Sequence, residues 1–335
     1  MSAGRVQLVA TSARTPGLLT WPAWEALRAG PVLTGDPDHP QLPALRAAGV
    51  QVRVRERAAD AVLARELAEQ AQGGGCVVWL TSPGDEGLAR ALGMLALRPS
   101  GARVEVEVLH GSYDPPGARL LDVVAVMDRL RSPGGCPWDA EQTHASLRPY
   151  LLEEAYEAYQ ALEDEDPVAL REELGDVLLQ VVFHARLAEE SDPAWSVDDV
   201  AGDLVDKLVR RHPHVFAGAS ADDLEGSWDA LKAAEKGRTS VTEGVPLGQP
   251  ALSLAAKLQK RAGRLGAPVP AYDGPGGQLW ELVRRCREQG LDPEAELRAV
   301  ARRFRDELAR AERAVRDEGG DPAVLGEQEW AARWS

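Results

Sequence analysis

Five acidic side chains in two groups are the densest concentration of chemically reactive residues in the sequence. Glu153, Glu154 and Glu157 form the first group, and Glu173 and Asp176 form the second. Acids three residues apart lie on the same face of a helix. Carboxylates that converge at a half-buried site repel each other, and a hard divalent cation such as Mg²⁺, with its oxygen ligands, relieves that repulsion. The pattern therefore predicts a magnesium site at Glu154, Glu157, Glu173 and Asp176, with Mn²⁺ as a substitute.

Two helices joined by a tight turn must position these acids. The periodicity predicts one helix over 146–163 and a second that runs to about Glu190, with Asp164 and Pro167 breaking the chain between them. If the two helices are antiparallel neighbours, counting residues from that turn places their acidic pairs opposite each other. The apolar side of the second helix is formed by Leu170, Leu174, Val177, Leu178, Val181 and Val182. The acids border this stripe, which favours a half-buried metal site over the alternative of a solvent-exposed acidic face.

Two more helices complete the predicted all-α region. One carries the apolar stripe of 120–130, and a Pro/Gly loop at 132–139 separates it from the helix over 146–163. The other begins at a Ser196 cap and ends near Arg211. Four helices with short loops predict a bundle. A ferritin-like di-iron site is an alternative, but it needs Glu-x-x-His on two helices. Glu141 and His144 make one such match, and no second copy exists because His184 has no Glu three residues before it.

A basic cluster ends the fourth helix, in a chain that is acidic overall. Lys207, Arg210 and Arg211 stand there, followed by two histidines. Arginine suits bidentate phosphate contact and lysine supplies a point charge, so we expect these three to bind a polyphosphate. Favourable pairing of cations with the end of a helix is the alternative. Trp138 in the preceding loop could stack on a base or simply anchor the loop.

Residues 1–115 differ in character, because short apolar runs alternate there with helical stretches. Such alternation predicts an α/β layer. The expected strands are 6–10, 50–54, 76–80 and 104–109, and the expected helices are 21–28, 58–72 and 86–95. No GxGxxG follows a strand and no GxxxxGK phosphate loop is present. Beyond the bundle, 237–250 reads as a linker, and 251–263 and 277–317 read as helical.

Composition and charge narrow the class of protein further. The net charge of −15 argues against direct binding of nucleic-acid polymers or anionic membranes. The three cysteines are scattered without a CxxC, which fits a reducing cytoplasm rather than a disulfide framework or zinc ribbon. No apolar run approaches the length of a membrane span. We therefore expect a cytoplasmic protein.

The chain resembles the MazG family of nucleoside triphosphate pyrophosphohydrolases. Four motifs in the family's order carry the resemblance: Arg129–Asp139, Leu152–Glu157, Glu173–Phe183 and Asp206–Phe216. The family implies an all-α fold, homodimers, Mg²⁺, and hydrolysis of nucleoside triphosphates to monophosphate and pyrophosphate, a reaction of nucleotide-pool housekeeping. Its metal-binding positions fall on the four acids identified above. Its first motif glutamate falls on Glu153, which we expect to position or deprotonate the attacking water.

The resemblance also implies a division of the chain. We expect a truncated, non-catalytic α/β domain at 1–115, faintly similar to tetrapyrrole methylases at 20–24, 34–40 and 82–85. The catalytic MazG-like domain spans 118–236, and a degenerate second MazG-like region spans 251–335. That region lacks the paired acids, because Gln278 stands where the family has Asp. A non-catalytic helical dimerisation or regulatory protein is the alternative to this enzyme.

Overall fold

The computed structural model describes residues 4–56, 58–83, 85–97, 104–218 and 240–333. The chain divides into two compact units, Met1–Lys207 and Leu208–Ser335. The end of the predicted catalytic domain, 219–236, and the first residues of the predicted linker, 237–239, lie outside the described residues. Within the described part of the chain, no helix is both long enough and apolar enough to cross a membrane.

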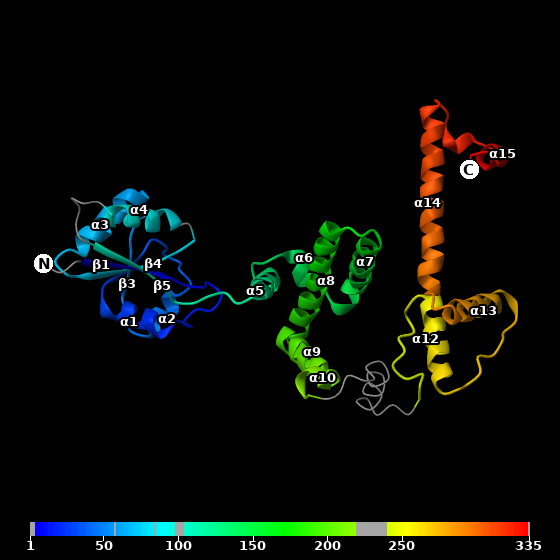
Figure 1. The fold of residues 1–335 in the computed structure, drawn as a ribbon, viewed down its shortest axis with the longest axis horizontal. Helices are drawn as coiled ribbons and strands as arrows, with labels where there is room; N and C mark the ends of the chain where they lie inside the picture. The colour runs from blue at the N-terminus through cyan, green and yellow to red at the C-terminus, as the bar shows by residue number, and fades with distance from the viewer. Residues whose placement is uncertain (1–3, 57, 84, 98–103, 219–239, 334–335) are drawn as a thin grey trace. The chain divides into compact units, whose positions relative to one another are not determined.

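A parallel five-stranded sheet forms the N-terminal part, as the alternation of strands and helices predicts. Its strands run in the order β3-β2-β4-β1-β5. Their bounds are β1 Gly4–Ala10, β2 Val32–Thr34, β3 Val52–Val54, β4 Cys76–Leu80 and β5 Val104–His110. The helices are α1 Trp21–Ala29, α2 Leu42–Ala47, α3 Asp60–Gln70 and α4 Glu86–Ala96. Figure 1 shows α1 and α2 on one face of the sheet and α3 and α4 on the other.

Each face of the sheet has its own apolar core, because strands that helices cover on both faces carry apolar side chains on both faces. Leu8, Trp79 and Leu67 belong to the core under α3 and α4. Val9 and Val78 belong to the core under α1 and α2. The strand β2 and the helix α2 were not among the expected elements, because both are too short to show a period in the sequence.

The helical part of the first unit contains α5 Arg119–Arg131, α6 Pro137–Glu141, α7 His144–Glu163, α8 Pro167–Ala188 and the part of α9 Val197–Arg211 that ends at Lys207. The short α6 lies in the segment expected to be a Pro/Gly loop, and that expectation was wrong for its last part. Pro137 occupies the first position of α6, where its missing N–H costs nothing. The turn between α7 and α8 forms as predicted, with Asp166 accepting hydrogen bonds from the amides of Val168 and Ala169 at 2.9 and 3.1 Å.

Three of these helices share a core. Met127 of α5, Leu147 of α7, and Val182 and Phe183 of α8 are buried together, and Figure 1 shows α7 and α8 lying along each other. The predicted apolar stripe of α8 is only partly covered. Leu174 is 53% exposed, against an expectation of burial. Periodicity identifies an apolar face of a helix, but it does not identify what covers that face.

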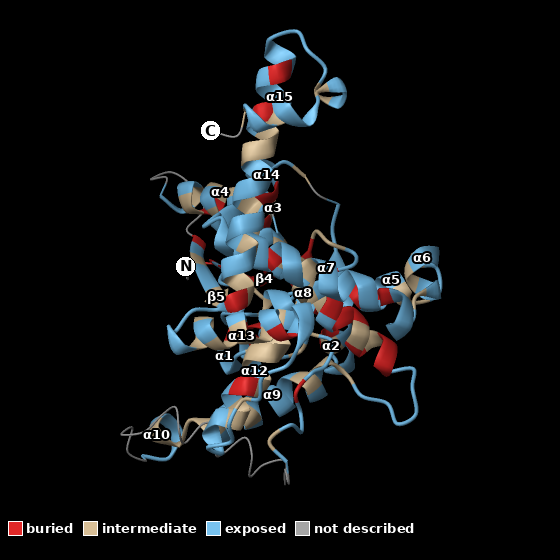
Figure 2. Cartoon of the chain, turned by 90° about the vertical axis from the view of Figure 1, so that its right-hand side faces the viewer, coloured by how far each residue is buried: buried red, intermediate tan, exposed pale blue. Residues whose placement is uncertain are grey.

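The fourth helix of the predicted bundle, α9, has no buried residue. Its first residue, Val197, packs at the edge of the core formed by α5, α7 and α8. Further along the helix Leu204, Val205, Leu208 and Val209 are exposed. The closed four-helix arrangement therefore stays a prediction. In Figure 2, which marks buried residues in red, most of the helical surface is pale blue or tan.

The second unit contains α10 Pro213–Phe216, α12 Ala251–Arg264, α13 Gly274–Glu288, α14 Pro293–Asp317, the 3₁₀ turn η1 Pro322–Val324 and α15 Glu327–Ala331. The segment 277–317 was expected to be one helical stretch and is two. The chain turns at Gly290, whose φ of 74° is left-handed. Asp292 then caps α14 by accepting a hydrogen bond from the amide of Glu294 at 2.9 Å.

Candidate active site

The structure brings the two acidic pairs together across the α7–α8 hairpin. One carboxylate oxygen from each of Glu154, Glu157 and Glu173 lies within 4.8 Å of the other two. Asp176 is close enough for its charge to act on both Glu154 and Glu173. Glu154, Glu173 and Asp176 are half-buried, and Glu157 is exposed. Counting residues from the turn thus correctly predicted that the acidic pair of α7 lies opposite the acidic pair of α8.

The electrostatics of this cluster oppose full ionisation. Partial burial, followed by the charges of Asp176 and Glu157, raises the pKa of the Glu154 carboxyl. Partial burial, followed by the charges of Glu157 and Asp176, also raises the pKa of Glu173. Neighbouring oxygens around octahedral Mg²⁺ stand about 3 Å apart, since metal–oxygen distances are about 2.1 Å. A small inward movement of these side chains would reach that spacing, so the donor set and its charge fit a hard divalent cation.

The other residues expected near the site lie on the same helices or just before them. Glu153 is exposed on α7, next to Glu154, and its charge contributes to the raised pKa of Glu154. Trp138 lies in α6, and the residue is 51% exposed. It meets the ring of Tyr150 on α7 edge-on, with 6.3 Å between the ring centroids. Trp138 is therefore partly accessible to solvent.

The expected phosphate-binding cations lie on the last turns of α9. Lys207 is half-buried and is the last residue of the first compact unit, while Arg210 and Arg211 belong to the second unit. The next residue, His212, bonds back to the helix through its Nδ1, which lies 2.7 Å from the carbonyl oxygen of Leu208. The three cations therefore share one helix end.

Comparison with known proteins assigns the helical region. A family model for the MazG nucleotide pyrophosphohydrolase domain matches residues 142–216, which include all four predicted metal ligands. A nucleoside triphosphate pyrophosphohydrolase of Mycobacterium tuberculosis is 46% identical over 232 residues, covering 65% of this chain and 69% of that one. A nucleoside triphosphate pyrophosphohydrolase/pyrophosphatase MazG of Thermotoga maritima is 39% identical over 230 residues, covering 61% and 89%. The chain belongs to the MazG family.

Family membership confirms the expectation of an enzyme that acts on phosphoric anhydrides. An uncharacterised 26.1 kDa protein of Streptomyces cacaoi is 52% identical over 240 residues, covering 69% of this MazG chain and 98% of that one. None of these matches tests the likeness of residues 1–115 to a methylase, which stays a prediction.

Two side-chain pairs in the MazG helical region were missed in the sequence. The Nδ1 atoms of His144 and His184 lie 2.8 Å apart, with the rings stacked. Arg131 donates to both carboxylate oxygens of Glu190 at 2.9 Å, and its third nitrogen donates to two backbone carbonyls at the end of α6. The residue count that aligned the acids also aligns His144 with His184, so this pair could have been predicted from the sequence. The Arg131–Glu190 pair, which joins α5 to the end of α8, had no signal.

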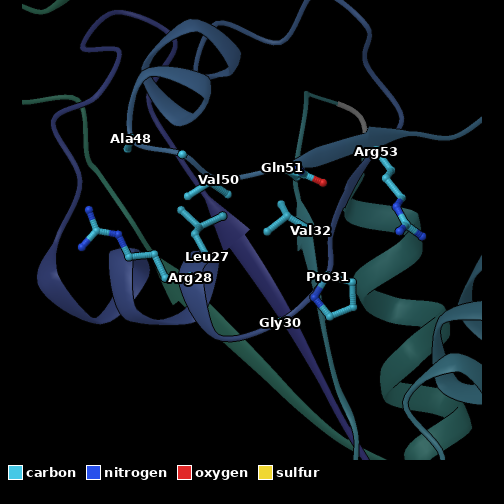
Figure 3. A pocket seen from close by; sticks show the side chains of 10 residues that line it. Leu27, Arg28, Gly30, Pro31, Val32, Ala48, Val50, Gln51 and Arg53 are labelled. Atoms are coloured by element: carbon cyan, nitrogen blue, oxygen red, sulfur yellow. The ribbon is translucent and has the colours of Figure 1, made fainter.

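A shallow hollow in the sheet domain is not a competing site. It measures about 300 Å³ and lies where β2 and β3 begin. Figure 3 shows aliphatic side chains such as Leu27 and Val50 between Arg28 and Arg53, whose charged groups lie on opposite sides. Parallel sheets bind ligands at the carboxyl ends of their strands, and this hollow lies at the amino ends. Its two charged side chains therefore do not converge on a common ligand position.

Proposed function

We propose that this MazG protein is a Mg²⁺-dependent nucleoside triphosphate pyrophosphohydrolase. It converts an NTP or dNTP and water to the monophosphate and pyrophosphate, as part of nucleotide-pool housekeeping. The observation that carries the proposal is the convergence of Glu154, Glu157 and Glu173 with raised pKa values for two of them. The names of the relatives support the substrate class.

Glu154, Glu157, Glu173 and Asp176 would hold the cation. When bound, Mg²⁺ supplies positive charge that neutralises the phosphate oxygens and the charge that develops on them, and Mn²⁺ can replace it. Without a cation these four acids disfavour an anionic substrate. The carboxylates therefore make substrate binding depend on the metal.

The remaining residues bind and orient the reactants. Glu153 would hold the attacking water and take its proton; its exposure and the effect of its charge on Glu154 support this role. Lys207, Arg210 and Arg211 would hold the triphosphate through charge-assisted hydrogen bonds. Trp138, which is partly exposed, would stack its ring on the base.

We also propose that the active form is a homodimer. Apolar side chains that a single chain leaves exposed follow α8 and α9, among them Leu174, Val181, Leu204 and Val205. A second copy of the chain would bury them, since exposed apolar faces of this kind mark association surfaces. The dimer would work in the cytoplasm without binding nucleic-acid polymers or membranes.

The flanking regions do not supply a second active site in this proposal. The N-terminal sheet domain is a shortened, non-catalytic relative of methylase domains. Region 251–335 is a degenerate MazG-like unit. There Glu281 is paired with Arg284, with 2.5 Å between Oε1 and the guanidinium nitrogen, instead of facing other acids. Within the described residues, only Glu154, Glu157 and Glu173 form a group of three potential metal ligands.

A panel of NTPs and dNTPs, incubated with the protein with and without Mg²⁺, tests the proposal. We expect pyrophosphate and a nucleoside monophosphate as products, and no turnover after chelation. A Glu173→Gln variant that folds but does not turn over would link the activity to the cluster. Absence of turnover with every nucleotide would favour the alternative of a helical assembly protein.

A further inference from the structure

A cavity between α12 and α13 in the second unit has no role in the proposed function. It measures about 540 Å³, within the range of small-molecule sites. Gln259 and Gly263 of α12, Val269 of the connecting loop, and Arg284, Arg287 and Glu288 of α13 line it. All six belong to one compact unit, and none is among the residues proposed for catalysis.

Hydrogen bonds of the buried residue Gln259 fix one wall of this cavity. The side chain of Gln259 is 1% exposed, and its amide nitrogen donates to the carbonyl of Trp280 at 2.9 Å. Its amide oxygen accepts from a guanidinium nitrogen of Arg287 at 3.3 Å. The indole of Trp280 in turn donates to the carbonyl of Pro270 at 3.0 Å, which ties down the connecting loop. The Arg287 guanidinium is thus oriented before any ligand arrives.

The two arginines of the cavity differ in how far their charge is compensated. Arg284 is bonded to both Glu281 and Glu288, and its hydrogen bond lowers the pKa of Glu281 to about 2. Arg287 has the neutral amide of Gln259 as its partner, and the structure pairs it with no acid in the described part of the chain. Its positive charge therefore faces the cavity uncompensated.

The local charge is opposite to that of the whole chain. Residues 251–290 contain seven Lys and Arg against three Asp and Glu, whereas the chain carries a net charge of −15. A basic hairpin in so acidic a protein attracts anions selectively. The planar fork of arginine matches phosphate oxygens, and the Glu288 carboxylate accepts hydrogen bonds from hydroxyl or amino groups.

We propose that this cavity binds a small phosphate monoester carrying hydroxyl groups, of the size of a nucleoside monophosphate. Arg287 holds the phosphate, Glu288 accepts from a hydroxyl or amino group, and Val269 contacts an apolar part of the ligand. The site is separate from the carboxylate cluster and does not depend on a divalent cation.

Calorimetric titration of the full chain in EDTA, with each of the four nucleoside monophosphates, ribose 5-phosphate and inorganic phosphate, tests this site. We expect at least one ester to bind, and to bind more tightly than inorganic phosphate. Arg287→Gln should weaken that binding about tenfold or more. Gly263→Leu should abolish it, because a Cβ at this helical position meets no atom within 4 Å and a larger side chain fills the cavity.

Two controls separate this site from its surroundings and from the catalytic cluster. Arg285→Gln changes a neighbouring exposed arginine that pairs with Glu281 and does not line the cavity, and it should leave binding unchanged. Glu173→Gln should also leave metal-free binding intact, even if it abolishes turnover. The proposal is overturned if no ester binds, if inorganic phosphate binds as tightly as the esters, or if Glu173→Gln abolishes binding. Unchanged binding in folded Arg287→Gln and Gly263→Leu variants overturns it as well.

Discussion

Replacing Glu154 with Gln should make the metal-free protein more stable. The amide keeps the shape of the side chain and can donate a hydrogen bond to Glu157, while it removes one negative charge from the cluster. Oxygens of Glu154 and of its two acidic neighbours lie within 4.8 Å of one another. At that separation two charges repel by about 1 kcal/mol in a water-like dielectric, which is the appropriate limit for a half-exposed site. The gain for Glu154→Gln is therefore about 1–2 kcal/mol at low salt.

A thermal melt at pH 7 in EDTA measures this gain. For a unit of this size, about 1–2 kcal/mol corresponds to a rise in Tm of roughly 2–8 °C. Since the folded state raises the pKa of Glu154 above its usual 4.5, the penalty in the wild type is present above the folded pKa and disappears as the pH falls toward 4.5. The difference between variant and wild type should therefore shrink at acidic pH.

The response to Mg²⁺ should have the opposite sign. If the cluster binds Mg²⁺ as proposed, Mg²⁺ at a hundred times its Kd should stabilise the wild type by about 2.7 kcal/mol through mass action, and Glu154→Gln should show a smaller shift. Glu281→Gln is the matched control. The pKa of Glu281 is lowered to about 2 by its hydrogen bond to Arg284, so losing this charge should lower stability. An unchanged Tm for Glu154→Gln at low salt would show that the carboxylates do not repel one another, and an equal Mg²⁺ shift in variant and wild type would show that Glu154 does not bind the cation.

Three further changes probe other parts of the site. Arg210→Ala should raise KM for triphosphates about tenfold to a hundredfold in steady-state assays and weaken monophosphate inhibition less; equal losses would contradict a polyphosphate contact. Burial, followed by the charge of His144, lowers the pKa of His184 below 6.5. The free energy of unfolding, measured with urea, should therefore fall as the pH drops below that value. A His184→Gln variant whose stability falls with pH as steeply as that of the wild type would contradict this prediction. Arg131→Met should cost about 3 kcal/mol in urea unfolding because Arg131 is 8% exposed and four hydrogen bonds are lost, whereas Arg129→Met, on the same helix, should cost little.

Local signals in the sequence were sufficient to predict the α7–α8 hairpin and its acids. Asp166 and Pro167 mark the start of α8, and counting from the turn aligns Glu154 and Glu157 with Glu173. The strand β4 was predicted at its observed bounds, because five apolar or sulfur-containing residues follow a glycine turn. In these places local chemistry and tertiary structure agree, so the pattern alone decides the element.

The features that were missed depend on contacts between distant residues. Gly290 and Pro293 divide 277–317, and the helical periodicity on either side hid that break. Leu174 belongs to an apolar stripe but lies exposed, because a single sequence does not say whether the same chain or a second copy covers the stripe. The pairing of Arg131 with Glu190 over 59 positions is likewise set by how helices pack.

The position of bond cleavage decides whether this chain releases pyrophosphate or orthophosphate. The protein is incubated with a nucleoside triphosphate and Mg²⁺ in water labelled with ¹⁸O, and the products are separated and weighed by mass spectrometry. Attack on the phosphorus next to the nucleoside places the label in the nucleoside monophosphate and leaves unlabelled pyrophosphate, and the Glu154→Gln variant should form neither product. Label found only in free orthophosphate, with nucleoside diphosphate as the second product, would contradict the account.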